Sequence, residues 1–181
     1  MGRVSSLVAL LEGYRPQTAD VSRAIAVARS DDPWTRASAL HVTASALVVH
    51  PPTRRVLLRW HARQQAWLQV GGHADPGETD PLEIVLREGR EETGLTDLAP
   101  WPDASLRHVV VVPVAARGDE PGHEHADVRF VLATGTPDDV RPEKADAALR
   151  WLTVAEAREL TTEQNLREFL GRIDELFAVR A

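Results

Sequence analysis

Three glutamates crowd one short segment of the chain, and their spacing could support binding of a divalent cation. Residues 87–92 read REGREE, so Glu88, Glu91 and Glu92 lie three and four positions apart. In a helix, these separations bring side chains together on one face, where like charges repel by roughly 0.2–0.5 kcal/mol per pair. Hard cations such as Mg²⁺ are held by a few carboxylates with water and substrate phosphates. The alternative is a solvated acidic helix face, and the spacing alone leaves both readings open.

Helix signals on both sides of this segment predict the element that positions the glutamates. Asp80 can cap the helix, Pro81 suits its first position, and Glu83 could complete a capping box. Gly94 supplies a left-handed stop, so we expect a helix over residues 81–93. Arg87 and Glu91 are four apart and can pair, which would leave Glu88 and Glu92 the least compensated carboxylates. The expected apolar face consists of Leu82, Val85, Leu86, Gly89 and Thr93.

The sequence before this helix brings a glycine pair close to the acidic face. Gly71 and Gly72 follow a predicted strand, and glycine there allows close backbone approach with carbonyl oxygens directed inward. The whole segment resembles the Nudix hydrolase signature: Gly72, then Glu78, then residues 87–95, REGREETGL. The preceding phrase WLQVGG resembles the family's W-x-x-P-G-G, with Val70 in place of proline. Two further departures are an extra residue between Glu78 and Arg87, which puts the role of Glu78 in doubt, and Gly89 in place of a bulky aliphatic residue.

The resemblance implies an α/β fold, a Nudix-like α/β/α sandwich with a mixed sheet. It also implies a metal-dependent pyrophosphohydrolase that uses Mg²⁺ or Mn²⁺ to cleave a nucleoside diphosphate linked to a group X, or a related small diphosphate. Cations of this kind neutralise phosphate charge and lower the pKa of an attacking water. By the same resemblance, the ligands are Glu88, Glu91 and Glu92, the Gly71 carbonyl is an extra ligand, and Arg87 orients Glu91.

A general base or further ligand is expected from outside the signature. The best candidates are Glu124 and Asp127, in the segment GHEHAD just before a predicted strand. Strand alternation would place His125, Asp127 and Arg129 on one face. A polar loop leading into a strand explains the segment equally well. The candidates for a leaving-group pocket are Trp67, His73 and His125, with His61, and each could equally be ordinary surface or packing.

The remaining elements predict one mixed α/β domain with helical additions. We expect an N-terminal helical extension over residues 1–38 and the catalytic domain over 39–181, ending in C-terminal helices interrupted near residues 161–162. The predicted strands are 42–49, 55–60, 66–70, 106–116, 128–134 and 149–153. The extension is expected to serve packing or dimerisation.

Composition excludes several classes of function. The 181 residues carry a formal net charge of −6, which argues against nucleic acid as the primary partner because non-specific nucleic-acid binding needs excess positive charge. No apolar run is long enough to span a bilayer, so a cytoplasmic protein without a membrane partner is expected. The chain has no cysteine, which disfavours an isomerase of isoprenoid diphosphates, whose typical catalytic cysteine is missing. A non-catalytic Nudix-fold ligand sensor is the other alternative, and the complete set of carboxylates opposes it.

Overall fold

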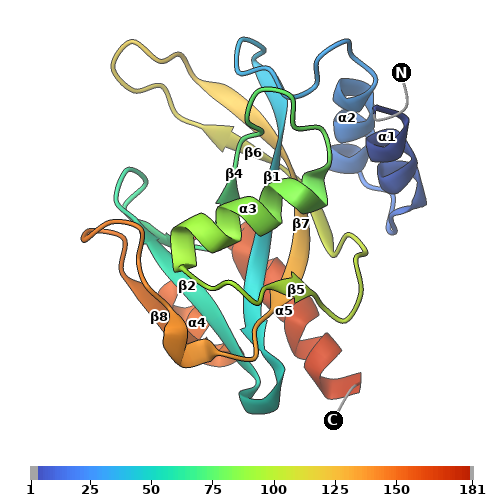
Figure 1. Cartoon of the computed structure of the whole chain (residues 1–181). Coiled ribbons are helices and arrows are strands. Elements are labelled where there is room, and N and C mark those ends of the chain that lie inside the picture. Colours follow the sequence, from blue (N-terminus) through green and yellow to red (C-terminus); the bar gives the residue numbers. More distant parts are fainter. Residues whose placement is uncertain (1–3, 180–181) are drawn as a thin grey trace.

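The computed structural model describes residues 4–179 and shows a mixed β-sheet covered by helices on both faces (Figure 1). The strands are β1 (Leu40–His50), β2 (Arg55–His61), β3 (Ala66–Leu68), β4 (Val70–Gly72), β5 (Ala99–Pro100), β6 (His108–Val114), β7 (His123–Ala133) and β8 (Leu149–Thr153). The α-helices are α1 (Val4–Gly13), α2 (Ala19–Ala28), α3 (Pro81–Thr93), α4 (Val154–Leu160) and α5 (Gln164–Val179). The predicted α/β class is confirmed.

Strand β1 lies at the centre of the sheet and pairs with three other strands, β2, β4 and β7. The strand order is β3-β2-β1-β7-β5, and β4, β6 and β8 pair with β1, β7 and β2 respectively. Strands β1 and β7 run parallel, whereas β1 is antiparallel to both β2 and β4. The sheet is therefore mixed, and β1 connects the strand that leads into α3 with β7.

Alternation along β1 divides the apolar side chains between two cores. Ala44, Ala46 and Val48 belong to a core shared with α1, α2 and α3, whereas Leu47 and Val49 belong to one shared with α4 and α5. Successive strand residues face opposite sides of a sheet, so one strand supplies both layers. The helical layers on either side of the sheet give the α/β/α sandwich.

The N-terminal helices share the core of the sheet. Leu7 and Leu11 of α1 and Val21 of α2 are essentially inaccessible to solvent and join the core on the α3 side. The extension therefore packs onto the domain, although its first three residues lie outside the described part of the chain. None of the described helices is both long enough and apolar enough to cross a membrane.

Helix α3 begins and ends as the sequence predicts, but its cap and its buried face differ in detail. Asp80 accepts a hydrogen bond from the amide of Leu82, not from that of Glu83, so the predicted capping box is replaced by a simple cap. Gly94 ends the helix in the left-handed conformation, with φ 71°. Ile84 is fully buried while Leu82 is only partly buried, so the buried face of the helix includes Ile84, which the predicted apolar face left out.

Two predictions differ most from the observed strands, because pairing across the sheet decides where strands begin and end. The predicted strand 66–70 is divided: β3 pairs with β2, and β4 crosses over to pair with β1. Strand β7 begins at His123, five residues earlier than predicted, since its early residues pair with both β1 and β6. The interruption near residues 161–162 is confirmed by the gap between α4 and α5.

Candidate active site

Helix α3 and strand β4 approach each other so closely that Glu88 lies against the backbone of Gly72. A Cβ atom added to Gly72 would lie 2.6 Å from Oε1 of Glu88. The neighbouring amide of Gly71 donates a hydrogen bond to Oε2 of Glu92 at 3.0 Å. The glycine pair thus lines the acidic face of α3, as the sequence predicts, and the extra ligand role of the Gly71 carbonyl stays a prediction.

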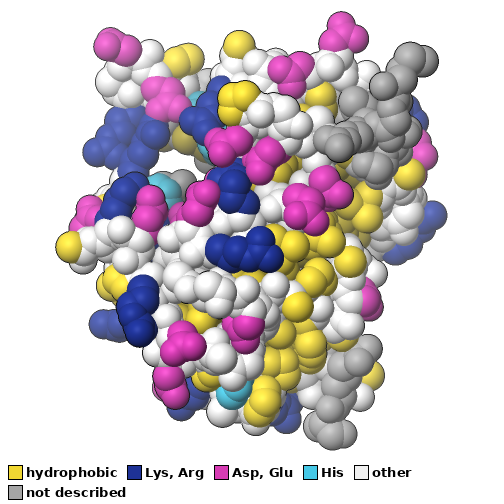
Figure 2. All heavy atoms as spheres, in the orientation of Figure 1, with side chains coloured by type: hydrophobic (Ala, Val, Ile, Leu, Met, Phe, Trp, Pro, Cys, Tyr) yellow, Lys and Arg dark blue, Asp and Glu magenta, His cyan; other side chains and the backbone are white. Residues whose placement is uncertain are grey.

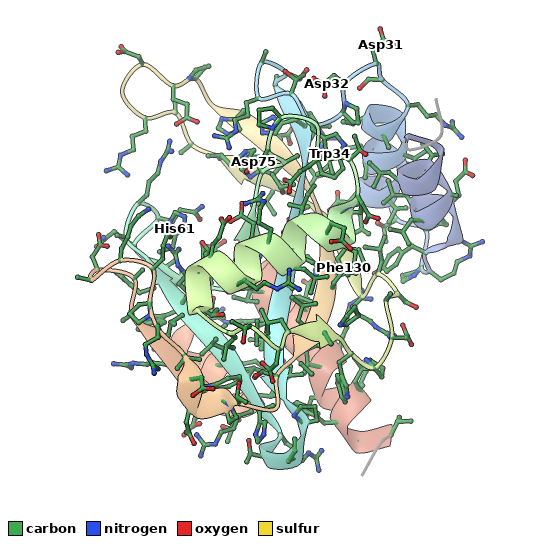
Figure 3. All side chains as sticks on the ribbon, in the orientation of Figure 1. Asp31, Asp32, Trp34, His61, Asp75 and Phe130 are labelled. Carbon is green, nitrogen blue, oxygen red and sulfur yellow. The ribbon has the colours of Figure 1, made fainter. Side chains whose placement is uncertain are left out.

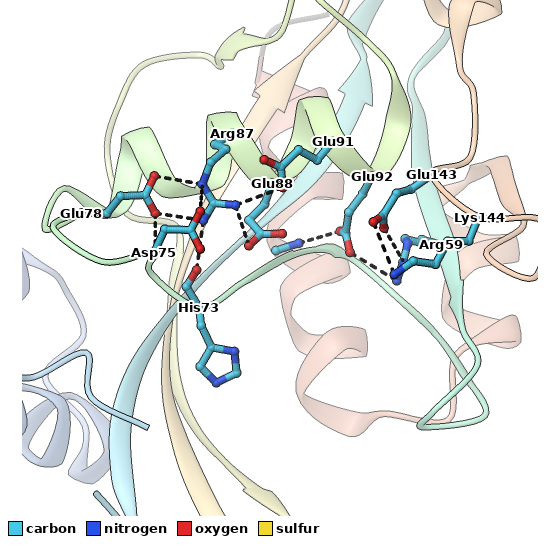
Figure 4. A network of polar contacts seen from close by, with 11 residues as sticks. Arg59, His73, Asp75, Glu78, Arg87, Glu88, Glu91, Glu92, Glu143 and Lys144 are labelled. Carbon is cyan, nitrogen blue, oxygen red and sulfur yellow. Dashed lines mark hydrogen bonds and ion pairs between the residues drawn. The ribbon is translucent and has the colours of Figure 1, made fainter. Parts of the chain in front are cut away.

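Arg87 is the centre of an ion-pair network along α3 (Figure 4). Its Nε and Nη2 donate to the two carboxylate oxygens of Glu78, both at 2.9 Å. Its Nη1 donates to Glu88 at 3.0 Å and to Glu91 at 3.1 Å, and Nη2 also donates to the backbone carbonyl of His73 at 3.0 Å. A planar guanidinium suits this bidentate geometry. Arg87 therefore fixes Glu88 and Glu91 relative to the loop before the helix.

The network gives Glu78 a role that its position in the sequence left in doubt. The carboxylate of Glu78 holds Arg87 in bidentate fashion and also accepts from the amide of Asp75 at 2.8 Å. The hydrogen bond from Arg87 is the main cause that lowers the pKa of Glu78. The longer loop before the helix therefore does not prevent Glu78 from reaching the arginine.

Glu92 is the most buried of the three glutamates, at 9% exposure. Burial raises its pKa to about 7, against the opposing effects of Arg59 and of the Gly71 amide. Burial also raises the pKa of Glu88. Both carboxylates, expected to be the least compensated, have an arginine nearby: Arg87 pairs with Glu88, and Nη1 of Arg59 lies 3.3 Å from Glu92. Even so, these ion pairs do not fully offset the loss of hydration at either carboxylate.

Beside the glycine pair the surface opens into a cleft of about 680 Å³. Figure 2 shows this side of the molecule hollowed between basic (dark blue) and acidic (magenta) side chains. His61, at the end of β2, and Asp75, on the loop before α3, flank this region in Figure 3, and His61 lines the cleft. A volume of this size is typical of a small-molecule site.

The structure separates the residues proposed from outside the signature. Asp127 lines the cleft but is 4% exposed, and it accepts hydrogen bonds from Thr43 at 2.9 Å, Ser45 at 2.8 Å and Arg129 at 2.7 Å. Glu124 is not among the residues that line the cleft, and it forms an exposed ion pair with Arg23 of α2 at 2.6 Å. Alternation along β7 turns the two carboxylates to opposite faces. The position of Asp127 in the cleft therefore supports a role at the site, whereas the position of Glu124 does not.

The predicted pocket residues also divide. His73 and His125 line the cleft, together with His61. Trp67 is not part of this lining; its ring packs 5.6 Å from that of Trp60 and lies 4.9 Å from the guanidinium of Arg150. Strand β3 presents Trp67 to the α4–α5 core, so tertiary packing turns it away from the cleft.

Sequence reasoning missed the arginines around the cleft. Arg36, Arg63 and Arg117 line it and come from three separate segments of the chain. Arg63 pairs with Glu120, and Arg117 donates to the backbone carbonyl of Arg63 at 2.9 Å. Their spacing in the sequence carries no periodic signal, because loops far apart along the chain bring them together. The lining of the cleft therefore combines basic groups that can complement phosphate with Gly71 and Gly72, the glycine pair that lies against the carboxylates of α3.

We predict that Gly71→Ala destabilises the protein far more than Gly77→Ala. Both glycines have positive φ, 140° and 90°, so either alanine is strained by roughly 1–3 kcal/mol. Only at Gly71 would the new Cβ also collide with backbone, 2.5 Å from both the Ala44 carbonyl oxygen and the Ser45 Cα, whereas Gly77 is open. Urea unfolding measures both variants, and equal losses of stability would show that the close approach of β4 to β1 is not a constraint.

Comparison with known proteins decides the family. A family model described as the NUDIX domain matches residues 39–173, most of the chain. The chain belongs to the Nudix family. No curated protein matches this Nudix chain significantly in sequence.

Solved structures similar to this Nudix protein include a C. elegans Ap4A hydrolase binary complex, with a TM-score of 0.59 and 19% identity over 76% of this chain and 97% of that one. An E. coli dihydroneopterin triphosphate pyrophosphohydrolase matches with a TM-score of 0.57 and 21% identity, over 80% of this chain and 97% of that one. A MutT NUDIX hydrolase from Burkholderia pseudomallei matches with a TM-score of 0.53 and 26% identity, over 74% of this chain and 97% of that one. The protein is thus a Nudix-type hydrolase, an enzyme that acts on phosphoric anhydrides.

Proposed function

We propose that this Nudix hydrolase cleaves a nucleoside diphosphate linked to a group X, or a related small diphosphate, with Mg²⁺ or Mn²⁺ as cofactor. The observation that carries the proposal is a pair of carboxylates packed against the backbone of Gly71 and Gly72: Glu88, which is partly buried, and Glu92, which is buried. Two acidic groups close together in a partly dehydrated site are costly unless a cation joins them.

The donor set fits a hard divalent cation. Mg²⁺ prefers oxygen ligands and takes one or two carboxylates plus substrate phosphates. Glu88 and Glu92 supply buried oxygens, and Glu91, whose side chain is 53% exposed, supplies a third carboxylate at the solvent side. We therefore assign Glu88, Glu91 and Glu92 as metal ligands, with the Gly71 carbonyl as an additional one. When bound, the cation would neutralise phosphate charge and lower the pKa of a water.

The protein's own residues bind and orient the substrate. Arg87 holds Glu88 and Glu91 in position through Glu78 and the His73 carbonyl. The basic side chains of the cleft complement the diphosphate, and His61, His73 and His125 line the space for the attached group. The basic side chains are those of Arg36, Arg63 and Arg117. Attack of water on phosphorus then divides the substrate into two phosphate-bearing products.

Asp127 acts here as a positioning residue. Its hydrogen bonds from Thr43 and Ser45 tie β7 to β1, and Ser45 pairs directly with Gly71 of β4. A carboxylate with its oxygens occupied in this way keeps the glycine pair in register with the acidic face. The expected general-base role of Glu124 has no support from its position, and the homodimer and the cytoplasmic location stay predictions.

Activity should be abolished by EDTA and restored by Mg²⁺ or Mn²⁺. A nucleoside diphosphate sugar, a dinucleoside polyphosphate and a nucleoside triphosphate make a suitable substrate panel, with each product identified by mass. Glu83→Gln is a matched control, because Glu83 is exposed on the first turn of the same helix, and it should keep full activity. Turnover that persists in chelator, or products limited to inorganic phosphate, would contradict the proposal.

A further inference from the structure

Four of the seven histidines in the chain gather in one cluster. They come from β1, from the segment after β4 and from the start of β7. Neighbouring ring centroids lie 4.8–5.4 Å apart. The members are His41, His73, His123 and His125.

Pairing of the strands creates the cluster. His41 and His125 are direct neighbours in the parallel β1–β7 ladder, and His123 and His125 lie two positions apart on the same face of β7. His73 follows β4, which pairs with β1. Figure 4 shows that the His73 ring points away from the Arg87 network, although its carbonyl accepts from Arg87. The cluster is therefore adjacent to the carboxylate site but separate from it.

Backbone carbonyls direct two of the rings inward. Nδ1 of His41 lies 3.0 Å from the Ser38 carbonyl oxygen, and Nδ1 of His123 lies 3.1 Å from that of Pro121. A carbonyl can only accept, so each Nδ1 carries a proton, and in the neutral form of the ring the lone pair is on Nε2. Those lone pairs face the cluster, with His41 Nε2 3.0 Å from His73 Nε2 and His123 Nε2 3.1 Å from His125 Nε2. Histidines that bind metals are held in this way, by a hydrogen bond from the other ring nitrogen.

From this geometry we propose that His41, His123 and His125 form a second metal site, specific for a borderline divalent cation such as Zn²⁺, with His73 as the fourth ligand. One nitrogen from each of the first three lies within 4.8 Å of the others. In a tetrahedral zinc site with Zn–N distances of about 2.0–2.1 Å, ligand nitrogens lie about 3.4 Å apart. Small rotations of the rings would therefore close the site.

The chemistry of the donors separates this site from the carboxylate one. Imidazole nitrogen suits zinc, copper, cobalt and nickel, whereas Mg²⁺ prefers oxygen. Burial lowers the pKa of His125 to about 4 and lowers that of His41, which agrees with neutral rings that keep a lone pair for a metal. His73, His123 and His125 also line the cleft, so a cation held there would place positive charge on its wall.

Zinc binding is tested by equilibrium dialysis of the full chain in excess Mg²⁺. We expect one equivalent of Zn²⁺ in the wild type, and a loss of affinity of at least about 30-fold in His123→Asn and His125→Asn, a scale typical of a damaged metal site. His61→Asn is the matched control, since His61 lines the cleft without joining the cluster, and it should bind normally. Glu88→Gln should also keep the zinc, because the proposal does not depend on the carboxylate site or on the proposed activity.

A second measurement uses the wild-type protein, so its outcome does not depend on whether the histidine variants fold. In ¹⁵N NMR of the imidazole rings, one equivalent of Zn²⁺ should shift the signals of the four cluster histidines and leave those of His50, His61 and His108 in place. The proposal is overturned if zinc binds equally well to the histidine variants, if Glu88→Gln removes it, or if the wild type binds none.

Discussion

Replacing Glu92 with glutamine should lower kcat by at least about 100-fold, the scale on which loss of one charge-stabilising group reduces catalysis, and yet raise the melting temperature of the metal-free protein. Glu92 is nearly inaccessible to solvent, and glutamine keeps its shape and can still accept from the Gly71 amide. The variant loses only the negative charge. That charge serves the proposed cation and is costly to the fold without one.

The gain in stability should depend on pH. The pKa of Glu92 rises from 4.5 to about 7 on folding because of burial, so between these values the folded state binds more protons than the unfolded state. Wild-type stability therefore falls as pH rises through this window, and glutamine removes the loss. In EDTA, the two proteins should melt at nearly the same temperature at pH 4.5 and differ by a few degrees at pH 8, since about 1 kcal/mol corresponds to roughly 2–4 °C.

A structural role for Glu92 predicts the opposite pair of results. If Glu92 mainly served as the partner of Arg59, its loss would lower the melting temperature and leave kcat near normal. Glu88→Gln should repeat the loss of kcat with a smaller gain in stability, because Arg87 gives up one of its partners. Glu83→Gln, exposed on the same helix, should change neither quantity.

Gly72→Ala should reduce kcat by about 100-fold while the fold is retained. The added methyl group would lie 2.6 Å from Oε1 and 2.8 Å from Cδ of Glu88, so this flexible side chain must move aside. A displacement of about 1 Å at a reacting centre can cost a factor of 100. Steady-state kinetics and thermal melting of the same preparation separate lost activity from lost folding.

Gly122→Ala is the matched control for Gly72→Ala. A Cβ at Gly122 would make only ordinary contacts, the nearest at 3.6 Å, so kinetics and melting should stay close to wild type. Normal kcat in Gly72→Ala would mean that Glu88 does not need its observed position for catalysis, which would remove it from the metal ligands.

The sequence by itself determined the central helix and the family. Asp80, Pro81 and Gly94 act within one helical turn of the ends they define, so local signals were sufficient to place both ends of α3. The i, i+4 pair of Arg87 and Glu91 was predicted for the same reason. The signature residues lie in one continuous segment, and the resemblance they carry was confirmed by the family match.

Only the tertiary structure decided the environment of those residues. Arg59 reaches Glu92 from β2, and burial in the folded chain raises the pKa of Glu92. The histidine cluster depends on the parallel β1–β7 register, which pairs His41 with His125 across more than eighty residues. No local periodicity encodes such a pairing, because it depends on which strands meet in the sheet and in which register. The sequence therefore specified the chemistry of the glutamates, while the fold determined their burial and which distant groups surround them.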